Sequence, residues 1–198
     1  TASTPSLEHL GRKLSDVVAG LPDGPVVVGH LEEVRAWDRV RAAVVTTSSD
    51  LERCMDTFRF LLARGCAVVS TCEELSWPWL RHPVLAQELH ELAVRHRGRI
   101  LGTGINPGFL MDALPVAATT VCQTVRALRI ERIQDAGKRR LPFQKKVGVG
   151  LAPAEFERQV AARTLRHVGL GESLHFLAHA LGWRIERSGA MGRGDRAV

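Results

Sequence analysis

Two adjacent carboxylates, Glu73 and Glu74, stand in the stretch STCEELSWPW (residues 70–79), directly after a short apolar run. An ionised carboxylate can bind an ammonium group, and as a general base it can take a proton from an amine or from water. Because side chains on successive residues of an extended loop point in different directions, only one of the two can face a given reacting atom. Trp77 and Trp79 follow the pair, and they either line an apolar pocket or pack the loop itself.

Hydroxyl side chains follow another apolar run, at Thr46, Thr47 and Ser48. At the end of a strand, such groups can bond a ligand through their hydroxyls and backbone amides. They can equally end the strand and cap the next helix, a role that Ser49 and Asp50 can already fill.

A third candidate is the glycine-rich stretch RILGTGINPGF (residues 99–109), which resembles the G-x-G-x-x-G fingerprint of dinucleotide-binding folds. That fingerprint holds a pyrophosphate on the free N–H groups of the helix that follows it. Here the third glycine comes one residue late, and Pro107 removes a backbone donor from the helix start. The sequence therefore argues against a phosphate cradle, and it predicts that Asn106 caps the next helix, with Pro107 at the first helical position.

A basic run, KRRLPFQKK, occupies residues 138–146. Its cations Arg139, Arg140, Lys145 and Lys146 could receive a carboxylate or a phosphate, because guanidinium groups bind both in a bidentate way. The alternative is a solvated basic loop. The formal net charge of +6 favours anionic partners, but it does not choose among nucleotides, carboxylate substrates and nucleic acid.

Metal binding and redox chemistry find little support in the sequence. His175 and His179 have the i, i+4 spacing of one helix face, but they lack the glutamate of the H-E-x-x-H motif and a third ligand, so no metal site is predicted. The four cysteines form no C-x-x-C pair and show no zinc spacing, which predicts reduced and mostly buried thiols. These cysteines are Cys54, Cys66, Cys72 and Cys122.

Short apolar runs alternate with amphipathic stretches over the first two thirds of the chain, which is the pattern of a parallel sheet covered by helices. We predict strands at residues 25–29, 42–46, 67–70 and 99–101. We predict helices at residues 7–19, 50–64, 84–96 and from 107 to about 122. Because ligands bind beyond the carboxyl ends of the strands in such a sheet, the hydroxyls, the glutamates and the glycine-rich loop are expected on one rim.

Residues 124–133 (TVRALRIERI) alternate apolar and polar side chains, which predicts a longer, half-solvated strand in a partly antiparallel sheet. Further helices are predicted at residues 153–166 and 172–181. We therefore expect two domains, at residues 1–105 and 106–198. The chain of 198 residues, 45% of them hydrophobic, can bury a core, and no apolar run in it is long enough to cross a membrane, so we expect a cytoplasmic protein.

Several of these stretches, taken in order, resemble the 2,4-diaminopentanoate dehydrogenase family and its relatives, the native amine dehydrogenases, within the dihydrodipicolinate reductase-like proteins. The resemblance extends over about residues 10–183 and rests on TTSS, STCEELSWPW, GTGINPGFLMD, RIQDAGKRRLPFQKKVGVGL and HVGLGES. It implies an α/β fold, with an incomplete Rossmann-type parallel sheet followed by part of an α+β substrate and dimerisation domain. It also implies interconversion of an amine and a ketone by hydride transfer with NADP or NAD, in a protein that is a homodimer when full length.

The resemblance implies roles for individual residues. A catalytic glutamate belongs in the STCEELSWPW stretch, as Glu74 or Glu73, with a marginal preference for Glu74 as the inward-facing member. The residues expected to contact the cofactor are Thr46, Thr47, Ser48 and Asn106. The residues expected to contact the substrate are Arg139, Arg140 and His167.

The chain also departs from the family pattern. Such proteins open with a strand and a glycine fingerprint, and neither precedes the first predicted helix here. We therefore expect an internal fragment that lacks the first βα unit and binds the cofactor poorly. The opening residues TASTP contain no acidic side chain to hold a ribose 2′-hydroxyl, and Thr1, Ser3 or Arg12 could instead accept a 2′-phosphate, which slightly favours NADP.

Two other functions stay open on sequence alone. The same fold could reduce a cyclic imine, as dihydrodipicolinate reductase does, although the His-rich lysine motif and the PSGT turn expected of that enzyme are missing from the sequence. The basic run at residues 138–146 could bind nucleic acid, but it lacks interleaved exposed aromatic residues and a recognisable binding motif. We expect a small amine or ketone as the partner, and neither nucleic acid nor a membrane.

Overall fold

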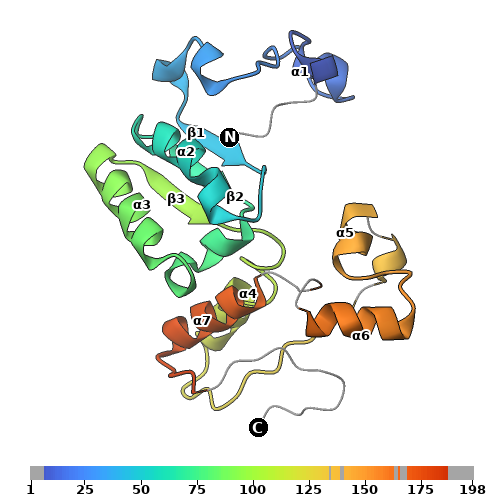
Figure 1. The fold of residues 1–198 in the computed structure, drawn as a ribbon. Coiled ribbons are helices and arrows are strands. Elements are labelled where there is room, and N and C mark those ends of the chain that lie inside the picture. Colours follow the sequence, from blue (N-terminus) through green and yellow to red (C-terminus); the bar gives the residue numbers. More distant parts are fainter. Residues whose placement is uncertain (1–6, 134, 139–140, 163–164, 166–168, 187–198) are drawn as a thin grey trace. The chain divides into compact units, whose positions relative to one another are not determined.

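The computed structural model describes residues 7–133, 135–138, 141–162, 165 and 169–186. The chain divides into two compact units, Thr1–Gly104 and Ile105–Val198. Figure 1 labels the helices and strands of both units. Among the described residues, no helix is long and apolar enough to cross a membrane.

Three parallel strands form the sheet of the first unit, in the order β1-β2-β3. They are β1 (Ala42–Val45), β2 (Ala67–Ser70) and β3 (Arg99–Gly102). Helix α2 (Leu51–Leu62) connects β1 to β2, and helix α3 (Pro83–His96) connects β2 to β3 (Figure 1). Each crossover is therefore a βαβ unit, which confirms the α/β class and three of the four strands predicted for this part of the chain.

Helix α2 begins at a side-chain cap, because the Asp50 carboxylate accepts a hydrogen bond from the Arg53 N–H at 3.1 Å. Its buried side chains recur at helical spacing and pack in one core with β1 and β2. They are Leu51, Cys54, Met55, Phe58, Leu61 and Leu62. Beyond the helix, Gly65 has φ +69, and a Cβ there would stand 2.9 Å from the His96 carbonyl oxygen, so the turn requires glycine.

Helix α3 lies beside α2 (Figure 1). The Arg59 guanidinium of α2 binds the Glu88 carboxylate of α3 in a bidentate pair, with Nε to Oε1 at 2.5 Å and Nη2 to Oε2 at 2.9 Å. The strand residue Val45 is buried in the core with these helices, whereas Val44 and Leu101 point to the opposite face of the sheet and are exposed. The two helices therefore cover one face of the sheet.

The residues before β1 form short turns. These elements are η1 (Leu7–His9), α1 (Leu14–Val17), η2 (Leu31–Glu33) and η3 (Trp37–Arg39). The prediction of one helix over residues 7–19 is wrong, because Gly11 adopts φ +76 and interrupts it. The prediction of a strand over residues 25–29 is also wrong: Val26 makes an isolated antiparallel bridge with Lys13, and the proline that opens this segment has no N–H to donate to a sheet.

The second unit is helical in the residues that the structure describes. Its elements are α4 (Ala113–Thr119), η6 (Ala136–Lys138), α5 (Leu141–Lys146), α6 (Pro153–Ala161) and α7 (Leu170–Leu181). Helices α4 and α7 pack against each other. Helix α6 ends earlier than predicted, and α7 begins two residues earlier than predicted.

Two predictions for the second unit are corrected by the structure. The strand expected at residues 124–133 is wrong, because this segment is irregular and forms no β-bridge with the other described residues; Ile133, at its end, is 94% exposed. The helix expected to begin at Asn106 and Pro107 begins instead at Ala113. Its cap is the Asp112 side chain, not the Asn106 side chain.

Candidate functional site

The three strands of the first unit end level with one another, since Val45 pairs with Ser70 and Ser70 pairs with Gly102 in the parallel register. The hydroxyls after β1, the glutamates after β2 and the loop after β3 therefore leave the sheet at the same edge. This carboxyl-terminal edge is where open α/β sheets bind ligands. We call it the rim.

The loop after β2 folds into two single turns, η4 (Glu73–Ser76) and η5 (Pro78–Leu80), and η4 lies against the end of β3. A Cβ at Gly102 would stand 2.5 Å from the Leu75 carbonyl carbon and oxygen, so glycine permits this close approach. Leu75 is buried in the core. The end of the sheet thus fixes the backbone that carries the two glutamates.

The Glu74 side chain is 12% exposed and has two described partners, both at Oε2. The backbone N–H of Leu51 donates to this oxygen at 2.9 Å, and Nε2 of His82 lies 3.0 Å from it. The N–H of Glu74 itself donates to the Ser49 carbonyl at 3.2 Å. Glu74 therefore joins the loop to the positive end of the α2 dipole, where a carboxylate is stabilised.

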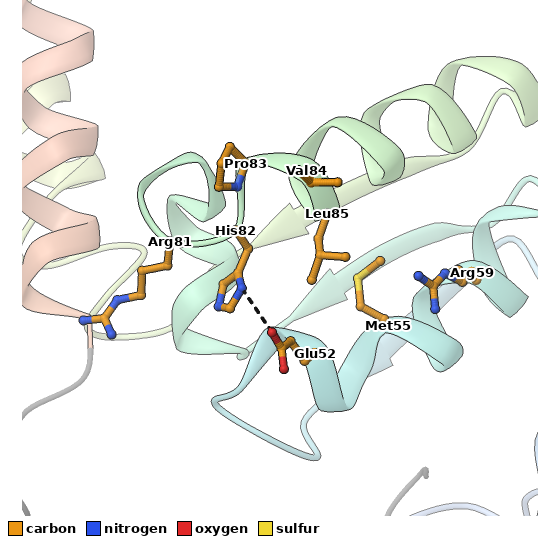
Figure 2. A pocket seen from close by; sticks show the side chains of 8 residues that line it. All are labelled: Glu52, Met55, Arg59, Arg81, His82, Pro83, Val84 and Leu85. Carbon is orange, nitrogen blue, oxygen red and sulfur yellow. Dashed lines mark ion pairs between the residues drawn. The ribbon is translucent and has the colours of Figure 1, made fainter.

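His82 occupies the N-cap position of α3 and lies between two carboxylates. Its Nε2 faces Glu74, and its Nδ1 is 3.7 Å from Oε1 of Glu52, the ion pair drawn in Figure 2. Figure 2 shows the imidazole beside a surface pocket of about 400 Å³, with Met55 and Leu85 among the residues that line it. A chain of three side chains thus connects this pocket to the rim.

Glu73 is half-buried at the first position of η4, and its carbonyl accepts a hydrogen bond from Ser76 Oγ at 2.7 Å. Trp77 is half-buried and Trp79 is 44% exposed, and neither belongs to the residues that line the pocket in Figure 2. The two glutamates therefore have different surroundings on one turn. Which of them faces a substrate stays a prediction.

The hydroxyls after β1 differ in what they contact. Thr46 and Thr47 are exposed at the rim, and Thr47 Oγ1 is 3.8 Å from the Cys54 sulfur. Ser48 Oγ accepts a hydrogen bond from the Asp50 N–H at 3.1 Å, which makes it part of the turn that leads into α2. Thr46 and Thr47 are therefore better placed than Ser48 to contact a ligand through their hydroxyls.

A pair of thiols beneath the rim was missed by sequence reasoning. Cys54 and Cys72 are each 1% exposed, and hydrogen bonding from the Cys72 thiol, with a smaller contribution from Thr47, lowers the pKa of Cys54 to about 6. The same interaction and burial raise the pKa of Cys72. Their sequence spacing carries no motif, so only the fold brings them together. Cys66 is also buried, as predicted, whereas Cys122 is exposed.

Asp112 organises the start of the second unit and was also missed. It is 1% exposed, and its Oδ2 accepts hydrogen bonds from the Gly108 N–H at 2.8 Å and from Ser173 Oγ at 2.7 Å. Its Oδ1 accepts from the Ala113 N–H at 2.6 Å. An aspartate directly before an apolar helical stretch is an N-cap signal, and it could have identified this residue from the sequence.

Pro107 of the stretch GTGINPG and Gly169 of the stretch HVGLGES meet within this unit. Gly169 has φ +100, and a Cβ there would stand 2.5 Å from the ring of Pro107, so the contact requires glycine. Oδ1 of Asn106 is buried and has no hydrogen-bond partner in the part of the chain that the structure describes. Asn106 therefore holds an acceptor that a ligand could use, and its expected contact with a cofactor stays a prediction.

Comparison with known proteins bears on both units. Residues 109–191 match the family model of the 2,4-diaminopentanoate dehydrogenase C-terminal domain. Over 161 residues the chain is 32% identical to a 2,4-diaminopentanoate dehydrogenase of Acetoanaerobium sticklandii, an alignment that covers 81% of the chain and 46% of that protein. The chain is therefore similar to the 2,4-diaminopentanoate dehydrogenases. This confirms the resemblance predicted from the sequence.

A solved structure matches the fold. The amine dehydrogenase from Mycobacterium smegmatis superposes with a TM-score of 0.70 at 22% identity, over 92% of this chain and 54% of that one. The chain therefore spans about half the length of the diaminopentanoate dehydrogenase and of the amine dehydrogenase that it matches.

The diaminopentanoate dehydrogenase resemblance also implied substrate contacts in the second unit. Arg139, Arg140 and His167 lie outside the described residues. Of the neighbouring cations, Lys138 is exposed and lies 3.9 Å from the Asp135 carboxylate. The three expected substrate contacts stay predictions.

Proposed function

We propose that the protein containing this chain is an oxidoreductase that interconverts an amine and a ketone by hydride transfer with a nicotinamide cofactor. The observation that carries the proposal is the position of Glu74, a positioned carboxylate at the carboxyl-terminal edge of a parallel sheet, in a chain similar to the 2,4-diaminopentanoate dehydrogenases. Diamines such as 2,4-diaminopentanoate are the first substrates to test.

The residues present suit one half of a dinucleotide. Thr46 and Thr47 offer exposed hydroxyls and amides at the rim, which fit the ribose next to the nicotinamide, and Asn106 offers an acceptor without a partner among the described residues. The described part of the first unit contains no glycine-rich strand–turn–helix to hold a pyrophosphate. We therefore assign Thr46 and Thr47 to the nicotinamide end only. The bound nicotinamide would accept a hydride from the amine-bearing carbon.

Glu74 performs the proton chemistry in this proposal. Oε2 is held by the Leu51 N–H and by His82, so we assign Oε1 to the substrate. Oε1 accepts a hydrogen bond from the substrate ammonium and takes one of its protons, which frees the nitrogen lone pair that assists departure of the hydride. After this proton has passed to solvent, the same oxygen takes a proton from the water that attacks the iminium carbon and returns it to the nitrogen, and the C–N bond then breaks. Ketone and ammonia are released, and reduction runs through the same steps in reverse.

Finer features of the proposal rest on the sequence. We propose NADP as the slightly preferred cofactor, because the opening residues TASTP lack an acidic side chain; Thr1 and Ser3 lie outside the described residues. We also propose a homodimer and a cytoplasmic location. The comparisons do not favour the cyclic imine reductase or the nucleic-acid-binding alternatives.

The test is steady-state oxidation of 2,4-diaminopentanoate and of simple amines by the protein that carries this chain, followed by formation of the reduced cofactor. Glu74→Gln should lower kcat by about a hundredfold or more, because the amide cannot take a proton. The matched control is Glu73→Gln on the same turn, which should retain most of the activity. Near-wild-type rates for both variants would remove this loop from the mechanism.

A further inference from the structure

The imidazole of His82 contacts the carboxylate to which we assign the proton chemistry. Nε2 of His82 lies 3.0 Å from Oε2 of Glu74, and the two side chains are 19% and 12% exposed. An ionised carboxylate only accepts hydrogen bonds, so the proton of this contact belongs to Nε2, which donates to Oε2. His82 is therefore a second donor to the oxygen that also accepts the Leu51 N–H at 2.9 Å.

Two donors from separate elements restrict the orientation of the Glu74 carboxylate. The last torsion of a glutamate side chain is broad, so a single hydrogen bond leaves the carboxylate free to turn. The Leu51 N–H belongs to the first residue of α2, and the His82 imidazole comes from the residue that precedes α3. Together they keep Oε2 occupied, and Oε1 is the oxygen that is left for the substrate.

The side chain of His82 does not cap the helix that it precedes. His82 is the N-cap residue of α3, but its imidazole accepts no hydrogen bond from the described N–H groups at the start of this helix. Its backbone is held separately, because its N–H donates to the Pro78 carbonyl and its own carbonyl accepts from the Ala86 N–H, both at 2.8 Å. Removal of the imidazole should therefore leave the turn before α3 in place.

The other ring nitrogen of His82 faces the surface pocket of about 400 Å³ that Figure 2 shows. Nδ1 lies 3.7 Å from Oε1 of Glu52, whose side chain is 73% exposed, and an ion pair this open to solvent contributes little. The contact with Glu74 is therefore the stronger of the two. Because the pocket extends to the imidazole, a small molecule can reach the space that His82 would leave.

We propose that His82 is a positioning residue for amine oxidation, whose Nε2–H holds Oε2 of Glu74 so that Oε1 meets the substrate ammonium. The inference rests on the proposed function, since it concerns the same carboxylate. His82 acts through Glu74 and needs no contact with substrate or cofactor. Without the imidazole the carboxylate can turn, so fewer bound substrates are aligned for proton transfer, and kcat should fall while KM changes little.

The experiment measures steady-state oxidation of 2,4-diaminopentanoate by the protein that carries this chain. His82→Ala should lower kcat by about tenfold and leave KM within about twofold of the wild-type value. His82→Gln should restore most of the lost kcat, because the glutamine amide also donates hydrogen bonds. The matched control is His90→Ala, which removes an exposed imidazole from the same helix and should change neither constant.

Added imidazole gives a readout that a structural role alone would not produce. Free imidazole can enter the pocket of His82→Ala and donate its N–H to Glu74, so it should raise the kcat of this variant in a saturable way. It should leave the kcat of the wild-type protein and of His90→Ala unchanged. A His82→Ala defect that neither the glutamine substitution nor imidazole reduces would overturn the inference.

A spectroscopic measurement tests the hydrogen bond without any activity. In the ¹⁵N-labelled protein, the ring nitrogen signals of His82, identified by their loss in His82→Gln, should show a proton on Nε2 at neutral pH. A bare Nε2 would overturn the inference whether or not the protein oxidises amines. An inactive wild-type protein would overturn the proposed function and this inference with it, whereas an active wild-type protein with an unchanged kcat in His82→Ala would overturn the inference alone.

Discussion

The Glu74 carboxylate accepts a hydrogen bond at 2.9 Å from the N–H of Leu51, the first residue of α2. First-turn N–H groups have no partner within their own helix, and here a side chain from the loop after β2 satisfies one of them. Glu74, to which we assign the proton transfer, therefore also connects the loop after β2 to helix α2. Substitution can separate the two roles, because glutamine keeps an acceptor oxygen and alanine does not.

Replacing Glu74 by alanine should lower the free energy of unfolding by about 1–2 kcal/mol, the usual effect of losing a helix cap. Glu74→Gln should lower it by less than half as much, while it abolishes most of the proposed activity. Urea denaturation measures the first effect and amine oxidation the second. Equal destabilisation by the two substitutions would contradict a capping role for this side chain.

Replacing Gly102 by alanine should displace the loop that carries the glutamates. The added Cβ would stand 2.5 Å from the Leu75 backbone, so we expect a loss of about 1–3 kcal/mol of unfolding free energy, as for overpacking in a core. Gly24→Ala is the control, because its Cβ would come no closer than 3.3 Å to a neighbouring atom. Urea denaturation measures the stability of both variants. Equal denaturation midpoints for Gly102→Ala and Gly24→Ala would contradict the close approach at Gly102.

Replacing Asp112 by alanine should destabilise the second unit by about 2–3 kcal/mol, because the Gly108 N–H and the Ser173 hydroxyl lose a charged acceptor. Ser173→Ala removes a single hydrogen bond and should cost about 1 kcal/mol. The double variant should lose less than the sum of the two single variants, since the residues share one contact. Strict additivity in urea denaturation would argue against that contact.

The lowered pKa of Cys54 predicts a dependence of stability on pH. The folded-state pKa of about 6 lies below the ordinary value of 9.0, so the thiolate contributes its full stabilisation above pH 9 and loses it as the pH falls through about 6. The ultraviolet absorbance of the thiolate in the folded chain should therefore show a step near pH 6. The step should vanish in Cys54→Ala, persist in Cys66→Ala, and move to higher pH in Cys72→Ala. A folded chain without the step would disprove the prediction.

The chain of 198 residues should by itself bind NADP and NAD only weakly, because its glycine-rich stretch does not match the pyrophosphate fingerprint. Calorimetry with each cofactor measures this directly. Micromolar affinity for either one would show that the residues present hold the pyrophosphate in another way.

Sequence patterns predicted the strands and helices whose own residues carry the signal for the element. Strands β1 to β3 are short apolar runs, and α2 places its buried residues at helical spacing, so each element carries its own signal. Residues 124–133 also alternate as a strand does, but a strand depends on backbone partners elsewhere, which a periodicity cannot reveal. Gly11 illustrates the opposite error, because a single left-handed residue divides an otherwise helical pattern.

The candidate site was predictable only as a set of positions. The end of each strand follows from the sheet, so the rim could be located from the sequence. The contacts of Glu74 with Leu51 and His82 depend on how the loop after β2 meets the starts of α2 and α3. Such contacts between distant segments leave no local signal.

The contact between Gly169 and the ring of Pro107 constrains any attempt to exchange parts among relatives. A larger residue at either position would need a compensating change at the other, since a Cβ at Gly169 already falls within 2.5 Å of the proline ring. A chimera that takes only the segment with Pro107, or only the segment with Gly169, from a relative would place mismatched side chains at this contact. Loop grafting within the family should therefore move the two segments together, as a single cassette.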